Sequence, residues 1–151
     1  MSVGDFILVD RGKYIGRLIR WATRSRWDHC ALVVSNTGDL TEALVRTGIT
    51  RSHISKYTDV DYVLVRTNGA PIDQKHLLRY SDRSVGEHYG FGNCLCVLIG
   101  YVTFGRLRLG TKNPNCSAHV ALGQLRLGAY FDKMAESMVP GDLARYYSVS
   151  P

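Results

Sequence analysis

Cysteine is scarce in this sequence and is never spaced as in a zinc site or a disulfide framework. The four cysteines, Cys30, Cys94, Cys96 and Cys116, are unevenly distributed and form no CxxC pair. A domain of this size with such a set does not depend on disulfide bonds. The Cys94-x-Cys96 spacing without a second pair is a weak zinc signal. We therefore expect reduced thiols, a reducing compartment, and a protein that needs no metal and no cofactor.

Long apolar runs and segment boundaries are absent too. The start of the chain, Met1 to Asp5, lacks the basic residues and apolar stretch of a signal peptide. The longest apolar run, residues 94–104, is too short to span a bilayer. No repeat, low-complexity tract or linker is visible, and the 45% hydrophobic and 21% charged residues are typical of a globular protein. The sequence predicts one domain over residues 1–151 that is made in the cytoplasm, and it leaves the final site of action open.

Acidic residues are fewer than basic residues, so the formal net charge is +6 and the isoelectric point is about 9.3. This balance favours acidic partners such as nucleic acid, anionic lipid or cell-wall polymer, and does not choose among them. The densest basic group lies on or just after a helix predicted over residues 13–23. Its simpler interpretation is a solvated helix face, and a binding patch is the alternative. The group consists of Arg17, Arg20, Arg24 and Arg26.

The apolar pattern predicts strands in the first half of the chain and helices in the second. This order indicates an α+β fold. Strands are expected over residues 5–9, 29–34, 39–45 and 60–66, with turn residues at 35–38. Helices are expected over residues 13–23, 72–80, 91–104 and 116–127, with short ones over residues 51–57 and from residue 140. The helix over residues 91–104 is apolar on nearly all sides, so we expect it to be buried and to line or back a groove beside Cys116.

Cys116 stands at the start of a predicted helix. It follows Asn113, Pro114 and Asn115, and either asparagine can cap the helix, with Pro114 at the first helical position in one case. In both cases Cys116 lies in the first turn, where free N–H groups and the helix dipole favour a thiolate. The same N–H groups can form part of an oxyanion hole. The alternative is a small buried cysteine of the kind common in protein cores.

A histidine and a carboxylate are expected on one face of the sheet. His29 starts one strand, and Glu42 shares a face with the apolar residues Leu40 and Leu44 of the next. A lone histidine there is more often a core or edge residue, but a carboxylate on an apolar face is costly unless paired. If residues 35–38 form a four-residue loop, Ala31 faces Glu42. His29 and Glu42 then become diagonal neighbours, about 7–8 Å apart in the backbone. A three-residue loop would put them on opposite faces.

These residues belong to a set of motifs whose order and spacing, over nearly the whole chain, resemble one known group. The group is the circularly permuted branch of the NlpC-type papain-like superfamily, the YiiX-like proteins, with lecithin retinol acyltransferases as distant relatives. The motifs are Val3-Gly4-Asp5-Phe6-Ile7, Trp27-Asp28-His29-Cys30-Ala31-Leu32-Val33, Glu42-Ala43 with Gly48-Ile49, Tyr89-Gly90-Phe91, Asn115-Cys116-Ser117 and Pro140-Gly141-Asp142-Leu143.

The resemblance implies a papain-like fold in permuted order, with a small antiparallel sheet packed against helices and the histidine strand before the cysteine helix. It implies Cys116 as nucleophile, His29 as general base and Glu42 as the acid that orients the imidazole. It also suggests Tyr89 as a polar group near the nucleophile, in the oxyanion hole, with an ordinary surface tyrosine as the alternative.

One position departs from the pattern. Relatives often have an acidic residue two positions after the cysteine, where this sequence has Ala118, followed by His119. The departure affects the expected substrate contacts and leaves the proposed catalytic set unchanged. His119, one helical turn after Cys116, is the alternative base.

The function implied is a cysteine hydrolase, either a peptidase or amidase or an esterase, that works through an acyl-enzyme. Family substrates are cell-wall peptides and lipid amides or esters. We therefore expect a peptide, acyl or lipid-like substrate, contact with a membrane or cell-wall surface, and no nucleic acid. One alternative is an acyltransferase that passes the acyl group to an acceptor other than water. Another is a catalytically idle binding module that kept the fold.

Overall fold

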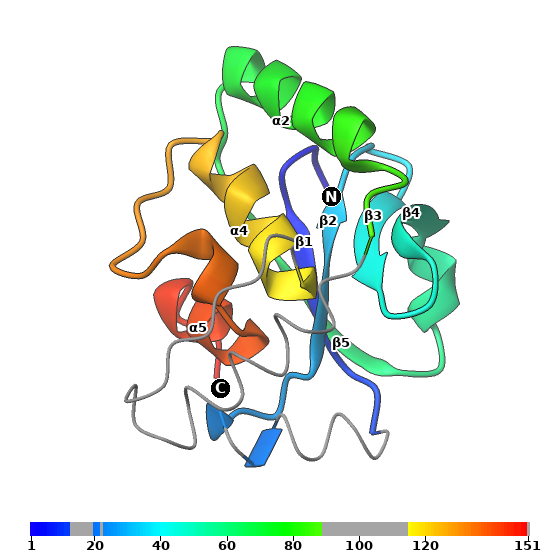
Figure 1. Ribbon diagram of the computed structural model, residues 1–151, viewed down its shortest axis with the longest axis vertical. Helices are drawn as coiled ribbons and strands as arrows, with labels where there is room; N and C mark the ends of the chain where they lie inside the picture. Colours follow the sequence, from blue (N-terminus) through cyan, green and yellow to red (C-terminus); the bar gives the residue numbers. More distant parts are fainter. Residues whose placement is uncertain (13–19, 22, 89–114, 151) are drawn as a thin grey trace.

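One antiparallel sheet organises the part of the chain that the computed structural model describes, which is residues 1–12, 20–21, 23–88 and 115–150. The strands follow the order β4-β3-β2-β1-β5 across the sheet, and each paired strand runs antiparallel to its neighbour (Figure 1). Their bounds are Phe6–Asp10 for β1, His29–Val33 for β2, Asp39–Leu44 for β3, Gly48–His53 for β4 and Asp61–Val65 for β5.

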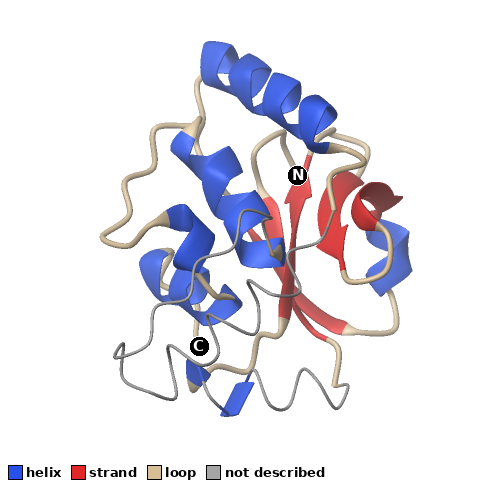
Figure 2. Ribbon diagram, in the orientation of Figure 1, coloured by secondary structure: helices blue, strands red, loops and turns tan. Residues whose placement is uncertain are grey.

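The α-helices follow the strands along the chain and cover one face of the sheet, whereas a short 3-10 helix precedes the last strand and packs on the other face. Figure 2 shows α2 across one end of the sheet, α4 against the sheet and α5 beside α4. The bounds are Pro71–Ser84 for α2, Cys116–Leu125 for α4 and Pro140–Tyr146 for α5, with short 3-10 helices η1 at Ile54–Tyr57 and η2 at Ala135–Ser137. The expected α+β class, with a small antiparallel sheet packed against helices, is confirmed.

Side-chain alternation along β1 and β2 divides the core into two parts. Phe6 and Leu32 belong to the larger part, which includes Val120 of α4 and Leu143 of α5. The intervening side chains face the opposite way and pack against η1. This smaller part consists of Ile7, Val9, Ala31, Val33, Leu40 and Tyr57. The site described below draws residues from both faces, because His29 and Cys30 are neighbours on β2.

The second strand pair has the register that the sequence predicts for a four-residue turn. Leu32 pairs with Thr41 and Val33 with Leu40, and the N–H of Val34 donates to the carbonyl of Asp39 at 2.8 Å. Gly38 in the turn has a φ of +109°, a left-handed conformation that glycine adopts readily.

The predicted short helix over residues 51–57 is wrong in its first half. Residues Gly48–His53 form β4 instead, which pairs with β3 from Asp39 to Leu44. Only Ile54–Tyr57 is helical, as a single 3-10 turn. Pairing with β3 buries Ile49, and this tertiary contact overrides the weak local pattern of the segment.

Three predictions fall wholly outside the described residues, and a fourth falls partly outside them. The three are the apolar helix over residues 91–104 with its groove, the position of Tyr89, and the Cys94 and Cys96 pair. Of the helix predicted over residues 13–23, residues 20, 21 and 23 are helical, and residues 13–19 and 22 lie outside the description. Within the described ranges, no helix has the length and apolar character needed to cross a membrane.

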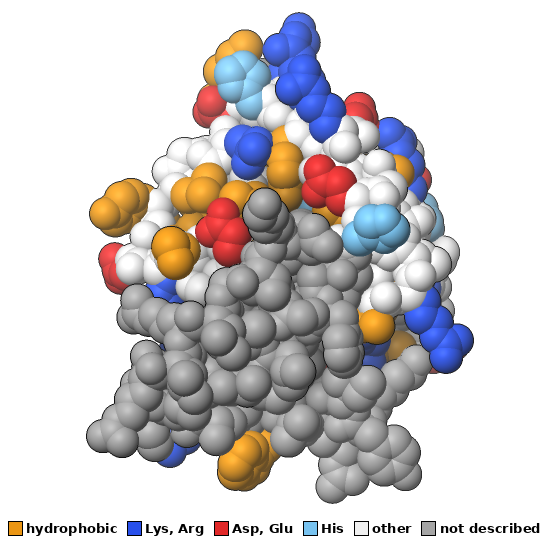
Figure 3. Space-filling view, viewed as in Figure 1, with side chains coloured by type: hydrophobic (Ala, Val, Ile, Leu, Met, Phe, Trp, Pro, Cys, Tyr) orange, Lys and Arg blue, Asp and Glu red, His pale blue; other side chains and the backbone are white. Residues whose placement is uncertain are grey.

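The densest basic group of the sequence is partly neutralised. Arg20 forms an ion pair with Asp10, and Arg26 lies 3.0 Å from a carboxylate oxygen of Asp61. Figure 3 shows Lys and Arg side chains along α2 at the upper end of one face. The exposed cations of this helix are Lys75, Arg79 and Arg83.

Candidate active site

Cys116 is the first residue of α4, and Asn115 caps the helix. The backbone of Asn115 is extended, and its side-chain oxygen accepts a hydrogen bond from the N–H of Ala118 at 2.8 Å. Of the two caps that the sequence allowed, Asn115 is therefore the one used, because a cap of this type satisfies the third helical N–H. The N–H groups of Cys116 and Ser117 have no acceptor within the helix. They lie, with the positive end of the helix dipole, at the end of α4 that Cys116 begins.

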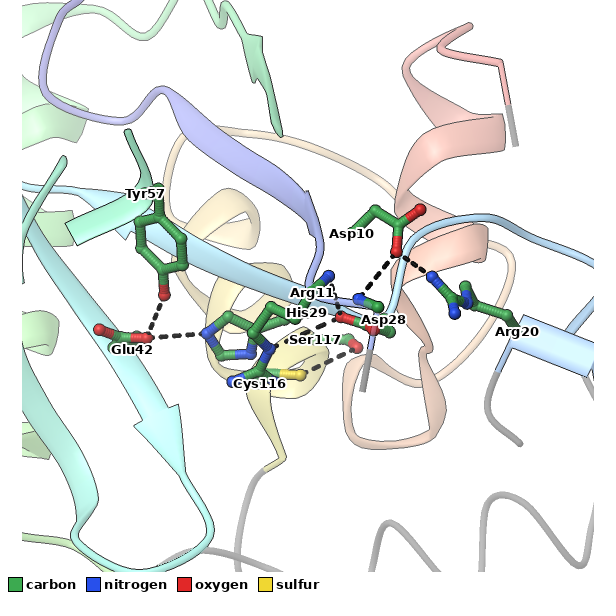
Figure 4. Close-up of polar contacts among 10 residues, drawn as sticks. Asp10, Arg11, Arg20, Asp28, His29, Glu42, Tyr57, Cys116 and Ser117 are labelled. Atoms are coloured by element: carbon green, nitrogen blue, oxygen red, sulfur yellow. Dashed lines mark hydrogen bonds and ion pairs between the residues drawn. The ribbon is translucent and has the colours of Figure 1, made fainter. Parts of the chain in front are cut away.

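His29 and Glu42 meet on the face opposite α4, as the register requires. The Nε2 atom of His29 lies 2.8 Å from Oε2 of Glu42, and both side chains are almost completely buried. Figure 4 shows the imidazole between this carboxylate and Cys116. Since Nε2 is occupied by Glu42, Nδ1 is the ring nitrogen left for the sulfur. The structure thus brings together His29, Glu42 and Cys116.

Two further side chains that contact Glu42 come from η1. The Tyr57 hydroxyl donates to Oε2 at 2.5 Å, and Nζ of Lys56 lies 2.6 Å from Oε1. Burial alone would raise the pKa of Glu42, but the hydrogen bond and charge of His29, followed by Lys56, hold it far below the usual range. Glu42 is therefore ionised at any physiological pH.

The electrostatics favour a charged pair between His29 and Cys116. Burial lowers the pKa of His29, but hydrogen bonds with Cys116 and Glu42 outweigh it and raise the pKa above its ordinary value. The pKa of Cys116 is well below that of a free thiol, with a hydrogen bond from Cys30 as the largest cause and one from His29 in addition. A thiolate beside an imidazolium is the state from which cysteine enzymes attack carbonyl groups.

Cys30 is a member of the site that the sequence reasoning did not include. It is buried on the α4 side of β2. Burial first, and then the neighbouring Cys116, raises its pKa well above the ordinary value. Cys30 therefore stays a thiol and can donate its S–H to the Cys116 sulfur. The signal was present in the sequence, because alternation places the residue after His29 on the opposite face, where the helices pack.

Arg11 and Asp28 lie beside the imidazole and the thiol. Arg11 donates its backbone N–H to Oδ1 of Asp28 at 3.2 Å, and Nε of Arg11 lies 3.6 Å from the same oxygen. The positive charge of Arg11 contributes to the low pKa of Cys116. Figure 4 shows this pair next to His29 and Ser117. The Ser117 hydroxyl is 3.9 Å from the Cys116 sulfur.

His119, the alternative base, is occupied by other partners. Its Nε2 lies 3.0 Å from the Thr41 hydroxyl, and its Nδ1 lies 3.0 Å from the Tyr80 hydroxyl. The Tyr80 hydroxyl also donates to the carbonyl of His119 at 3.3 Å, so Nδ1 carries the imidazole proton in a consistent network. Burial lowers the pKa of His119 to about 4. Both ring nitrogens are engaged away from Cys116, and the imidazole is neutral near pH 7.

The described residues include no evident metal site. No three His, Cys, Asp or Glu side chains among residues 1–12, 20–21, 23–88 and 115–150 come together as metal ligands. Tyr89, Cys94 and Cys96 lie outside these ranges.

Comparison with known proteins identifies a shared fold. No protein-family model and no curated protein matches the chain. Among solved structures, the chain is similar to the crystal structure of the metalloprotein YiiX from Escherichia coli O157:H7. The TM-score is 0.62 with 19% sequence identity, over 85% of this chain and 67% of that chain. The chain therefore has the α+β fold of YiiX, and the YiiX-like part of the resemblance is confirmed at the level of the fold.

Proposed function

We propose that this protein is a cysteine hydrolase of amide or ester bonds, with Cys116 as nucleophile, His29 as general acid and base, and Glu42 as the group that orients the imidazole. The observation that carries the proposal is the place of His29. Its buried ring has a carboxylate 2.8 Å from one nitrogen. The ring also interacts with the thiol at the start of α4, which raises the pKa of His29, while His29 lowers the pKa of the thiol.

The chemistry follows from this arrangement. The Cys116 thiolate attacks the carbonyl carbon of the substrate, and a C–S bond forms while the carbonyl oxygen takes up negative charge. We expect the free N–H groups of Cys116 and Ser117, at the start of α4, to stabilise that charge. The C–N or C–O bond then breaks, and His29 gives its Nδ1 proton to the leaving nitrogen or oxygen. In the second half His29 takes a proton from water, and the hydroxide oxygen attacks the carbonyl carbon of the thioester. The C–S bond then breaks, which releases the acid and restores the Cys116 thiolate beside the protonated His29.

The substrates that fit the proposal are those of the family that the sequence resembles, which are cell-wall peptides and lipid amides or esters. The same acyl-enzyme also serves an acyltransferase. The two outcomes differ only in whether water or another nucleophile attacks the thioester, so one experiment with and without an added amine separates them.

Acyl-enzyme formation can be tested with 4-nitrophenyl acetate, which needs no knowledge of the natural substrate. We expect a burst of about one equivalent of 4-nitrophenolate per chain and one acetyl group on the peptide that contains Cys116. Cys116→Ala should remove both signals, and hydroxylamine should remove the acetyl group from the wild-type protein. Acetyl transfer to added glycine ethyl ester in preference to water would indicate an acyltransferase. Absence of the burst in folded wild-type protein would leave the binding module as the better description.

A further inference from the structure

The Glu42 carboxylate accepts hydrogen bonds from three side chains. Of these, only His29 belongs to the proposed catalytic set. Oε2 accepts hydrogen bonds from both His29 and Tyr57, at 2.8 Å and 2.5 Å. Oε1 is 2.6 Å from Nζ of Lys56. The carboxylate is completely buried, whereas the Lys56 side chain is 46% exposed. If His29 were the sole partner of this buried carboxylate, the negative charge would interact with the imidazole at full strength.

That undivided charge would work against catalysis. A strong negative field at His29 favours the imidazolium, and an imidazolium that holds its proton too firmly is a poor donor to a leaving group. A phenol and an ammonium group on the same carboxylate reduce this field. Each of these groups donates a short hydrogen bond that partly neutralises the carboxylate.

We propose that Tyr57 and Lys56 act on the reaction through Glu42, by taking up part of its negative charge so that His29 can release its proton to the leaving group. This inference rests on the proposed function. Neither residue has a contact with Cys116 among the described hydrogen bonds, so both are positioning residues rather than catalytic ones.

Hydrogen bonds around η1 fix the positions of Lys56 and Tyr57 beside Glu42. They form the end of η1, whose first turn is capped by His53. The Nδ1 atom of His53 accepts from the N–H of Ser55 at 3.2 Å, and its Nε2 lies 3.1 Å from the carbonyl oxygen of Thr37. The turn that sets the register of Glu42 therefore also supports the helix that contacts Glu42.

The fit between this turn and η1 is close. The N–H of Ile54 donates to the carbonyl of Gly38 at 2.9 Å. A Cβ atom on Gly38 would lie 2.7 Å from Cγ2 of Ile54, so glycine is needed there for packing as well as for its positive φ. Tyr57 is 2% exposed, and burial, with the nearby charge of Glu42, raises the pKa of Tyr57 far above its ordinary value. Tyr57 is therefore a hydrogen-bond donor at every pH of interest.

A pH test must consider the other groups that face the pair. Ser52 of β4 contributes to the low pKa of Glu42. The groups that interact with His29 and Cys116 from the neighbouring elements include Arg11, Cys30, Glu42 and His119, with Asp28 bonded to Arg11. The test variants leave all of these unchanged.

The test is the pH profile of Cys116 alkylation by iodoacetate. With a thiolate and imidazolium pair the rate rises as the pair forms and falls as His29 loses its proton, because the anionic reagent is attracted by the imidazolium. We expect Tyr57→Phe and Lys56→Met each to move the falling limb to higher pH, by about half a pKa unit or more. Tyr62→Phe and Lys75→Met, which remove an exposed hydroxyl and an exposed charge elsewhere, serve as matched controls and should leave the limb in place.

The result separates this inference from the proposed function. A falling limb that stays in place in both test variants, or moves to lower pH, would overturn the inference and leave the proposed function intact. A wild-type profile without two limbs, with the ordinary titration of a free thiol, would instead count against the thiolate and imidazolium pair and so against the proposed function. Because phenylalanine keeps the ring of Tyr57 and methionine the stem of Lys56, both variants should fold, and urea unfolding checks this.

Discussion

The imidazole of His29 and the carboxylate of Glu42, from adjacent antiparallel strands, are 2.8 Å apart in a fully buried pair. Their contact requires the register in which Leu32 pairs with Thr41. It also places a charge in the smaller core, where it is tolerated because every oxygen of Glu42 has a partner.

Loss of the Glu42 charge should slow turnover without ending it. In Glu42→Gln the imidazole keeps a neutral neighbour but loses the charge that stabilises its protonated form. We expect kcat for a turned-over ester or amide to fall about 10²- to 10⁴-fold, less than in Cys116→Ala, which should abolish turnover. The falling limb of the pH profile should move to lower pH, because an imidazolium without its counter-charge loses its proton more easily. A Glu42→Gln enzyme with wild-type kcat and profile would show that the carboxylate has no part in the reaction.

Cys116 should be the fastest of the four thiols to react with iodoacetamide near neutral pH. Its pKa is lowered by Cys30 and His29, whereas the pKa of Cys30 is raised by burial, so only Cys116 of this pair is a thiolate. Labelled peptides identified by mass spectrometry after short exposures measure the order. The same experiment in urea, where the four rates should converge, is the control. Faster labelling of Cys30, Cys94 or Cys96 in the folded protein would show that the nucleophile is assigned incorrectly.

Stability should fall as the pH is lowered from 7 to 5, with His119 as a main cause. The folded-state pKa of about 4 lies below the ordinary 6.5, so the unfolded chain binds a proton first and the stability is lost as the pH falls through this window. The linkage predicts a loss of about 2 kcal/mol between pH 7 and pH 5 from this group. Urea unfolding at the two pH values measures it.

Two variants isolate the contribution of His119. In His119→Gln the loss between the two pH values should be smaller than in wild type. His76→Gln removes an exposed histidine of α2 and should leave the loss unchanged. Glu42 and His29 contribute little to this pH dependence. The pKa of Glu42 is lowered, so its contribution to stability is lost mainly below pH 5. The pKa of His29 is raised, so its contribution is lost as the pH rises above 6.5. Equal losses in wild type and His119→Gln would refute the assignment.

Removal of metal should leave the chemistry of Cys116 unchanged. The proposed steps use a thiolate, an imidazole and backbone N–H groups, and none of them needs a Lewis acid. We expect the 4-nitrophenolate burst to keep its amplitude after treatment with a chelator. Metal analysis of the purified protein should find less than about 0.1 equivalent of zinc. Stoichiometric zinc that survives chelation in folded protein, or loss of the burst with recovery on added metal, would contradict this prediction.

How far the sequence predicts the site depends on how local each contact is. The approach of His29 to Glu42 follows from alternation and from one turn length, both readable over residues 29–44. The helical start of Cys116 follows from a cap that lies beside it. Lys56 and Tyr57 could not be assigned to Glu42 from the sequence, because their contact requires η1 to be docked on the turn that precedes β3. That docking involves backbone atoms of Thr37 and Gly38, which leave no side-chain pattern.

The strand β4 likewise could not be predicted from the sequence, because it depends on contacts with a distant segment. Its residues, from Gly48 to His53, lack the run of branched and aromatic side chains that marks a strand. Gly48 lies so close to the backbone of Glu87 that a Cβ atom would be 2.1 Å from its carbonyl oxygen, and the N–H of Ile49 donates to that oxygen at 2.8 Å. The strand is fixed by a segment nearly 40 residues further along the chain, which no local pattern could indicate.

The turn between β2 and β3 has a consequence for how this protein can vary. Deletion or insertion of one residue there would rotate Glu42 to the other side of the sheet, and it would also remove the acceptors at Thr37 and Gly38 that hold η1. Both effects disturb Glu42: the first moves its side chain away from His29, and the second moves Lys56 and Tyr57 away from Glu42. A second mutation would therefore have to repair both at once. Homologues with this chemistry should therefore keep the length of this hairpin constant, even where the exposed loop after α4 has gained or lost residues.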